Sequence, residues 1–184
     1  MVIYLDMDGV VSDAHQAFLT AMGREDLIPN YHVEHAGEFD VNKAAGMTAE
    51  RMWSMVEAVG RGLWSRMPEL PWAHELYERL KKVGDVVFLT TPSQDPESLA
   101  GKLEWLHRFT KRGDFKDYIM TARKDLLAGP GRMLVDDRLE NVTAFREAGG
   151  AAILFPATWQ GKTDDEIWES LPIVVAHVEE AGAR

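Results

Sequence analysis

Acidic residues stand directly after two of the apolar runs in this sequence. Asp6 and Asp8 follow the first run, and the pair Asp136-Asp137 follows another one far along the chain. A carboxylate can attack phosphorus to form an acyl-phosphate, and a second carboxylate can donate a proton to the leaving alcohol. Mg²⁺ prefers oxygen ligands, which carboxylates and carbonyls supply. The two clusters predict phosphoryl transfer at a magnesium site made by Asp6, Asp8 and Asp136.

Other polar residues occupy comparable places. Thr90 and Thr91 end an apolar run, and Lys124 follows the next one. A hydroxyl group and nearby backbone N–H groups can hold phosphoryl oxygens, and an ammonium group together with the metal can offset their charge. Gly9 allows the backbone to approach closely where a side chain would obstruct. We therefore expect Thr90, Thr91 and Lys124 to bind the phosphate.

A parallel sheet would bring these residues together. Apolar runs that predict buried strands fall at 2–5, 85–90, 118–121, 132–135 and 151–155, and helical patterns fall at 10–22, 73–82, 97–109, 139–148 and 173–180. Strands that alternate with helices predict an α/β fold, a doubly wound parallel sheet covered on both faces. Ligands bind at the carboxyl edge of such sheets, so we expect Asp6, Thr90 and Asp136 to converge there.

Residues 24–70 interrupt this alternation with scattered aromatic residues and one clear helix pattern at 48–59. We interpret 14–70 as a small, mostly helical cap, and 1–13 with 71–184 as the α/β catalytic core. Such a cap would close over the site and exclude water. One or two of its aromatic residues could stack on a nucleobase; the candidates are Tyr31, Phe39, Trp53 and Trp64. His32 and His35 lack a convincing set of metal ligands.

The composition narrows the class of partner. The chain has 184 residues, a formal net charge of −10 and no cysteine. The acidic balance argues against a nucleic-acid polymer, because duplex binders usually present a basic face. No apolar stretch reaches the roughly 18 residues of a membrane helix, and the N-terminus lacks the basic region of a signal peptide. We expect a cytoplasmic protein with a small phosphomonoester substrate. A homodimer is possible, and the sequence does not decide the oligomeric state.

The polar residues resemble the four motifs of the haloacid dehalogenase superfamily. Asp6-Met7-Asp8-Gly9-Val10 matches the first motif, Thr90 the second, Lys124 the third and Asp136-Asp137 the fourth. In that superfamily the first aspartate is the nucleophile, and the second is the general acid/base of its phosphatases. Dehalogenases lack the second aspartate, so Asp8 favours phosphatase chemistry. The resemblance implies Asp6 as nucleophile, Asp8 as acid/base and Mg²⁺ as cofactor.

A narrower likeness is to the 5'(3')-deoxyribonucleotidases, which remove phosphate from deoxynucleoside monophosphates and carry a small helical cap after the first strand. The segments that resemble them are Asp6-Met7-Asp8-Gly9-Val10, Leu89-Thr90-Thr91-Pro92, Lys102-Leu103-Glu104-Trp105, Met120-Thr121-Ala122-Arg123-Lys124 and Val135-Asp136-Asp137-Arg138. Thr91 stands where serine is common in that family. The likeness implies a deoxyribonucleotidase.

Several assignments have alternatives. Asp137 could order the water shell of the metal, or pair with Arg138 or Lys124. Arg138 could contact the phosphate or sugar, or form a surface ion pair that contributes little. A phosphatase of the same superfamily acting on a sugar phosphate is a second hypothesis for the function. A non-catalytic module that binds a phosphate ligand is a third, although the intact set of polar residues argues against it.

Overall fold

The computed structural model describes residues 1–183; Arg184, the last residue of the predicted core, lies outside them. Five strands form one sheet in the order β3-β2-β1-β4-β5, and all neighbouring strands are parallel. The strands are β1 (Val2–Leu5), β2 (Asp85–Thr90), β3 (Tyr118–Met120), β4 (Arg132–Asp136) and β5 (Ala151–Leu154). The predicted doubly wound parallel sheet is confirmed.

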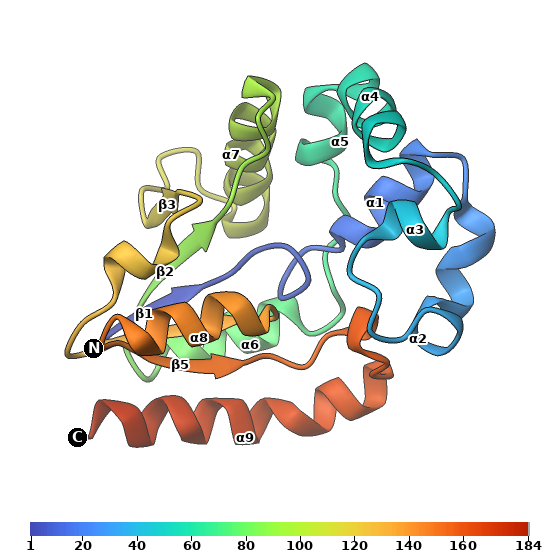
Figure 1. Cartoon of the computed structure of the whole chain (residues 1–184). Coiled ribbons are helices and arrows are strands. Elements are labelled where there is room, and N and C mark those ends of the chain that lie inside the picture. Colours follow the sequence, from blue (N-terminus) through green and yellow to red (C-terminus); the bar gives the residue numbers. More distant parts are fainter. Residues whose placement is uncertain (184) are drawn as a thin grey trace.

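Helices cover both faces of this sheet. Successive residues of each strand point to opposite sides, so apolar side chains stand on both faces and pack against helices there. On β1, Ile3 and Leu5 are buried in the larger core, whereas Tyr4 packs in a smaller core with Phe145. The helices that flank the sheet are α6 (Ala73–Lys81), α7 (Pro96–Thr110), α8 (Leu139–Glu147) and α9 (Asp164–Gly182). Figure 1 shows α8 and α9 running along the sheet.

The order of the strands creates a switch point beside β1. From β1 the chain builds the sheet outward through β2 and β3, and then returns to place β4 on the other side of β1. Ligands bind outside the carboxyl ends of the strands at such a point. The carboxyl ends of β1 and β4 carry Asp6 and Asp136, so the topology brings these two residues together.

The segment between β1 and β2 is almost entirely helical. It contains α1 (Ala14–Ala21), a 3₁₀ helix η1 (Glu25–Asn30), α2 (Tyr31–Glu34), α3 (Val41–Ala44), α4 (Ala49–Val59) and α5 (Arg61–Ser65). Figure 1 shows α1–α5 grouped beyond the carboxyl ends of the strands. Thr48 caps α4 by accepting the Arg51 N–H at 3.2 Å. The cap forms although Arg51 occupies the position where a capping box has an acidic residue.

The first predicted helix was wrong at its start. The structure begins α1 four residues later, because the Met7 carbonyl accepts the N–H groups of Val11 and Ser12, both at 2.9 Å, in a loop. Gly9 has a φ of +79° in this loop, which favours glycine. Asp13 then caps α1 by accepting the Gln16 N–H at 2.8 Å.

The last helix is longer than the pattern at 173–180 predicted. Helix α9 begins after Thr163, which forms a capping box with Glu166, and it continues through Pro172. Proline usually ends a helix because it lacks an N–H donor, which is why the pattern before it was not interpreted as the same helix.

Helix α5 packs closely on α7 at Gly101. A Cβ atom at this position would lie 2.5 Å from the Cβ of Trp64 and 2.7 Å from the carbonyl oxygen of Arg61. Only a glycine therefore allows this approach, which joins the end of the inserted helices to the helix that follows β2. Among residues 1–183, no helix is both long and apolar enough to span a bilayer.

Candidate active site

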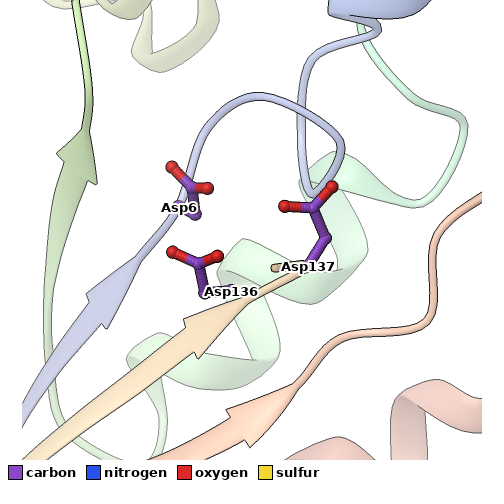
Figure 2. A group of neighbouring side chains, drawn as sticks. All are labelled: Asp6, Asp136 and Asp137. Atoms are coloured by element: carbon purple, nitrogen blue, oxygen red, sulfur yellow. The ribbon is translucent and has the colours of Figure 1, made fainter. Parts of the chain in front are cut away.

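Three carboxylates meet at the switch point of the sheet. Asp6 follows β1, Asp136 ends β4 and Asp137 comes next, and all three are buried. One oxygen from each lies within 4.8 Å of the others, and Figure 2 shows the three side chains around the ends of the two strands. This confirms that the two acidic motifs, 130 residues apart in sequence, converge.

One lysine joins two of these acids. Lys124, from the 3₁₀ helix η2 (Lys124–Leu127), places Nζ 2.7 Å from Asp6 Oδ1 and 2.7 Å from Asp136 Oδ2. Asp136 Oδ1 also accepts the Arg138 N–H at 2.9 Å and the Asn141 side-chain amide at 3.0 Å. The ammonium group thus pairs with two of the three buried carboxylates, Asp6 and Asp136, which leaves an excess of negative charge when all three are ionised.

This excess shifts the pKa values of the cluster. Burial raises the pKa of Asp6 from 3.8 to about 7, and the charge of Asp136 adds to the rise while Lys124 opposes it. Burial and then the charges of Asp6 and Asp136 raise the pKa of Asp137 well above its ordinary value. For Lys124, burial lowers the pKa, but the two neighbouring carboxylates outweigh burial and raise it overall. A bound cation would relieve the repulsion.

A second buried lysine holds Asp8. Lys102 is fully buried on α7; its Nζ pairs with Asp8 Oδ2 and donates to Thr90 Oγ1 at 2.8 Å and to the Thr91 carbonyl at 3.1 Å. The other Asp8 oxygen accepts the Ser12 hydroxyl at 3.2 Å. Asp8 is therefore held next to the ends of β1 and β2, with its side chain 30% exposed.

The two threonines differ in position. Thr90 is fully buried, and its hydroxyl oxygen accepts from Lys102, so its own hydrogen can be donated to another acceptor. Thr91 is exposed, lines the cavity described below and donates its hydroxyl to the Thr121 carbonyl at 3.1 Å. Both lie at the carboxyl edge of the sheet, where they were expected.

Gly9 is needed for the position of Asp137. A Cβ atom on Gly9 would lie 2.1 Å from Asp137 Oδ2. The same oxygen accepts the indole N–H of Trp159 at 2.6 Å, and the Asp137 carbonyl accepts the side-chain amide of Gln160 at 2.7 Å. The side chain of Asp137 therefore packs against the backbone of the first motif.

A cavity of about 920 Å³ opens over these groups. Asp6, Asp8 and Lys124 line its inner end. Its outer walls come from the segment between β1 and β2 and carry four aromatic side chains, Phe18, Phe39, Trp53 and Trp64. Tyr31 instead packs in the core and donates its hydroxyl to the Glu38 carbonyl at 2.8 Å. Phe18 was not singled out from the sequence.

Arg138 lies at the border between the sheet and the inserted segment. Its guanidinium stands 4.3 Å from the ring centroid of Phe39, and its Nε lies 3.6 Å from Glu140. It lines the cavity together with Asn141. Lys124 and Arg138 pair with carboxylates other than Asp137, whose side chain is held by Trp159.

Sequence reasoning assigned no role to Lys102, Asn141 or Trp159. Lys102 does carry a signal, because it shares a helical stripe with Trp105, Leu106 and Phe109, where a charged residue is unexpected. Asn141 and Trp159 stand among ordinary helix and loop residues, so their contacts with Asp136 and Asp137 depend on the fold.

The comparisons with known proteins agree with this geometry. The family described as 5' nucleotidase, deoxy (pyrimidine), cytosolic type C matches residues 1–169. The chain belongs to this family. Membership of the type C 5' nucleotidase family identifies an enzyme, a phosphatase, so the non-catalytic module is not retained.

Two curated relatives carry the same description, "Putative 5'(3')-deoxyribonucleotidase". One, from Bordetella pertussis, is 30% identical over 144 residues, which cover 75% of this chain and 74% of the relative. The other, from Vibrio phage KVP40, is 29% identical over 107 residues, which cover 55% of this chain and 62% of the relative. This chain is thus a deoxyribonucleotidase-like member of the type C 5' nucleotidase family.

Solved structures show the fold. A haloacid dehalogenase-like hydrolase from Xanthomonas campestris has a TM-score of 0.58 at 14% identity, covering 100% of this chain and 94% of its own. A hydrolase from Deinococcus radiodurans R1, with bound phosphate and sodium, has a TM-score of 0.55 at 14% identity, covering 98% and 96%. A Bacillus subtilis hydrolase bound to magnesium has a TM-score of 0.51 at 14% identity, covering 84% and 86%.

Proposed function

We propose that the protein is a magnesium-dependent 5'(3')-deoxyribonucleotidase that works through an aspartyl-phosphate on Asp6. The observation that carries this proposal is that Asp6, Asp8 and Lys124 line the same cavity as the four aromatic side chains. A phosphate at the inner end and a base against the aromatic rings would use both parts of the cavity. The family description adds pyrimidine deoxynucleotides as the class to test first.

The residues present fit Mg²⁺. The cluster offers carboxylate oxygens from Asp6, Asp136 and Asp137, which are the hard ligands that this ion prefers. Its excess negative charge is the kind that a divalent cation relieves. We propose Asp6, the Asp8 carbonyl and Asp136 as ligands, with Asp137 ordering the water around the ion. When bound, Mg²⁺ would offset the charge of the phosphoryl oxygens, so that a carboxylate could approach the phosphorus.

In the first step Asp6 attacks the phosphorus. Asp6 Oδ1 accepts the Met7 N–H at 2.7 Å and pairs with Lys124, so we assign the attack to Oδ2. A bond forms between this oxygen and phosphorus while the ester bond to the alcohol breaks. Asp8 donates a proton to the leaving oxygen, because it lines the same end of the cavity.

In the second step water releases the phosphate. Asp8, now ionised, takes a proton from a water molecule whose oxygen attacks phosphorus, and the bond to Asp6 breaks. Inorganic phosphate leaves and both aspartates return to their first state. Lys124 and the Thr90 hydroxyl would hold the phosphoryl oxygens during both steps, and the Thr91 hydroxyl would join them on leaving the Thr121 carbonyl. We propose residues 14–70 as the cap that excludes water from the first step.

The aromatic wall favours a nucleotide over a sugar phosphate. Aromatic faces stack on bases for about 1–3 kcal/mol per base, whereas a sugar needs polar partners. Phe39 is held in place by the guanidinium of Arg138, and Trp53 stands at the open side with 37% exposure. A sugar-phosphate phosphatase stays the alternative to be tested.

A phosphate-release screen with Mg²⁺ tests the proposal across deoxynucleotides, ribonucleotides and sugar phosphates. We expect the highest kcat/KM with deoxynucleoside monophosphates and no release in EDTA. Brisk release from a sugar phosphate, with none from any nucleoside monophosphate, would refute the assignment of substrate. Retained turnover in Asp6→Asn would refute the assignment of the nucleophile.

A further inference from the structure

We propose that Trp159 is a positioning residue that serves both ends of the site, holding Asp137 through its indole N–H and the cap residue Phe39 through its ring. The residue lies in the 3₁₀ helix η3 (Thr158–Gln160), between β5 and α9. It does not line the cavity over the described residues, so it would act through its neighbours. The inference rests on the proposed metal site and substrate pocket.

At the metal end, Trp159 orients a carboxylate. Its Nε1 donates to Asp137 Oδ2 at 2.6 Å, while the neighbouring Gln160 amide donates to the Asp137 carbonyl at 2.7 Å. The backbone of Gly9 closes the other side of the same oxygen, since a Cβ there would lie 2.1 Å away. Asp137 is therefore held by an aromatic donor on one side and by close packing on the other.

At the substrate end, the same side chain supports the aromatic wall. The Trp159 ring meets the Phe39 ring edge-on, with centroids 5.3 Å apart and planes at 77°. It also lies parallel to His15 at 6.4 Å, and His15 Nε2 lies 3.0 Å from the Phe39 carbonyl oxygen. Phe39 lines the cavity and Trp159 lies behind it.

The backbone of Trp159 completes the link. Its carbonyl accepts the N–H of Gly37 at 2.7 Å, which ties the loop before Phe39 to the segment after β5. One residue of the core thus contacts the acidic cluster and the inserted segment through three different groups. Removing a partner that orients a metal ligand typically costs about 10- to 100-fold in metal affinity or activity. Since Asp137 would hold the metal through water, we expect an effect near the lower end of this range.

Two substitutions separate the two contacts. Trp159→Phe keeps an aromatic ring and removes the N–H donor. Trp159→His removes the six-membered ring but keeps a ring nitrogen at the same number of bonds from Cβ, which can donate at pH 8. Trp168→Phe is the matched control, because Trp168 lies on α9 with 40% exposure and does not line the cavity.

Calorimetry without substrate measures the affinity for Mg²⁺ and, separately, for thymidine as a nucleoside probe. Trp159→Phe should weaken Mg²⁺ binding by about tenfold, leave thymidine affinity unchanged and recover turnover at high Mg²⁺. Trp159→His should bind Mg²⁺ more tightly than Trp159→Phe and lose about two- to tenfold in thymidine affinity, the range of an aromatic pair.

Equal Mg²⁺ affinities in Trp159→Phe and Trp168→Phe would overturn the inference and leave the proposed function intact. If Trp159→Phe does not fold, Trp159→His alone tests the role at the substrate end. A Trp159→His protein with the Mg²⁺ affinity and the thymidine affinity of wild type would overturn that role. Normal Mg²⁺ binding by wild type without release of phosphate from any nucleotide would overturn the proposed function alone. Absence of Mg²⁺ binding by wild type would overturn both.

Discussion

The buried lysine on α7 offers the most direct test of how the site is organised. Lys102→Met keeps the length of the side chain and its apolar stem, and removes the charge that pairs with Asp8 and the donor to Thr90 and Thr91. We expect kcat to fall, because Asp8 would lose the group that orients it, while Asp6 and Lys124 stay in contact. KM should change less than kcat, since Lys102 does not line the cavity over the described residues.

The magnitude follows from the contacts. A hydrogen bond to a charged group contributes about 1.5–3 kcal/mol, and about 1.4 kcal/mol is a factor of ten in rate, so losing the Asp8 contact alone predicts a fall in kcat of about 10- to 150-fold. Stability should fall less than for a fully buried ion pair, because the Asp8 side chain is 30% exposed and water can reach it; we expect about 1–3 kcal/mol.

Phosphate release with a deoxynucleoside monophosphate gives kcat and KM, and urea unfolding gives the change in stability. Lys81→Met is the matched control, because Lys81 is half exposed on α6, where it pairs with Glu78 and lies over the Tyr77 ring, away from the acidic cluster. It should leave both quantities unchanged. An unchanged kcat in Lys102→Met, in a protein that folds, would refute the role assigned to this residue.

Three further outcomes follow from the structure. The pKa of Asp6 is about 7 in the folded protein against an ordinary 3.8, so between these pH values the metal-free folded protein binds more protons than the unfolded chain and loses stability as the pH rises. Asp6→Asn should therefore raise the thermal midpoint in EDTA at pH 8, and raise it less at pH 5. An equal rise at both pH values would contradict this reasoning. Phe39→Leu should raise KM for a deoxynucleoside monophosphate by about fivefold or more and leave KM for glycerol phosphate unchanged; parallel changes would argue against base stacking. Gly101→Ala should destabilise by about 1–3 kcal/mol because its Cβ would lie 2.5 Å from that of Trp64; the control Gly62→Ala, which meets only the flexible end of Arg66, should be neutral or stabilising in urea unfolding.

The sequence was sufficient to predict the architecture and the reaction class. Short apolar runs that alternate with helical patterns predict a parallel sheet covered by helices. Strands that are buried on both faces need continuous apolar side chains, which these runs supply. The carboxyl ends of parallel strands share one edge, so the residues after those runs had to lie together. This is why Asp6 and Asp136 could be paired without coordinates.

Local patterns were weaker at the ends of helices. The start of α1 depends on a loop in which the Met7 carbonyl accepts three backbone N–H groups, and no side-chain periodicity predicts such a contact. The start of α9 was missed because Pro172 interrupts the pattern, although Thr163 and Glu166 form a capping box nine residues earlier.

Only the tertiary structure decided which residues hold the acidic motifs and which aromatic residues line the cavity. Lys102 reaches Asp8, and Trp159 reaches Asp137, across 94 and 22 residues of chain, and such contacts are set by how α7 and η3 pack against the sheet. Phe39 and Trp64 line the cavity, whereas Tyr31 packs in the core with its hydroxyl on the Glu38 carbonyl, because short helices and loops orient their side chains through packing rather than through a long periodic face. The sequence by itself therefore determined the chemistry, since that depends on residue types at strand ends. The folded chain determined the shape of the pocket, since that depends on contacts between distant segments.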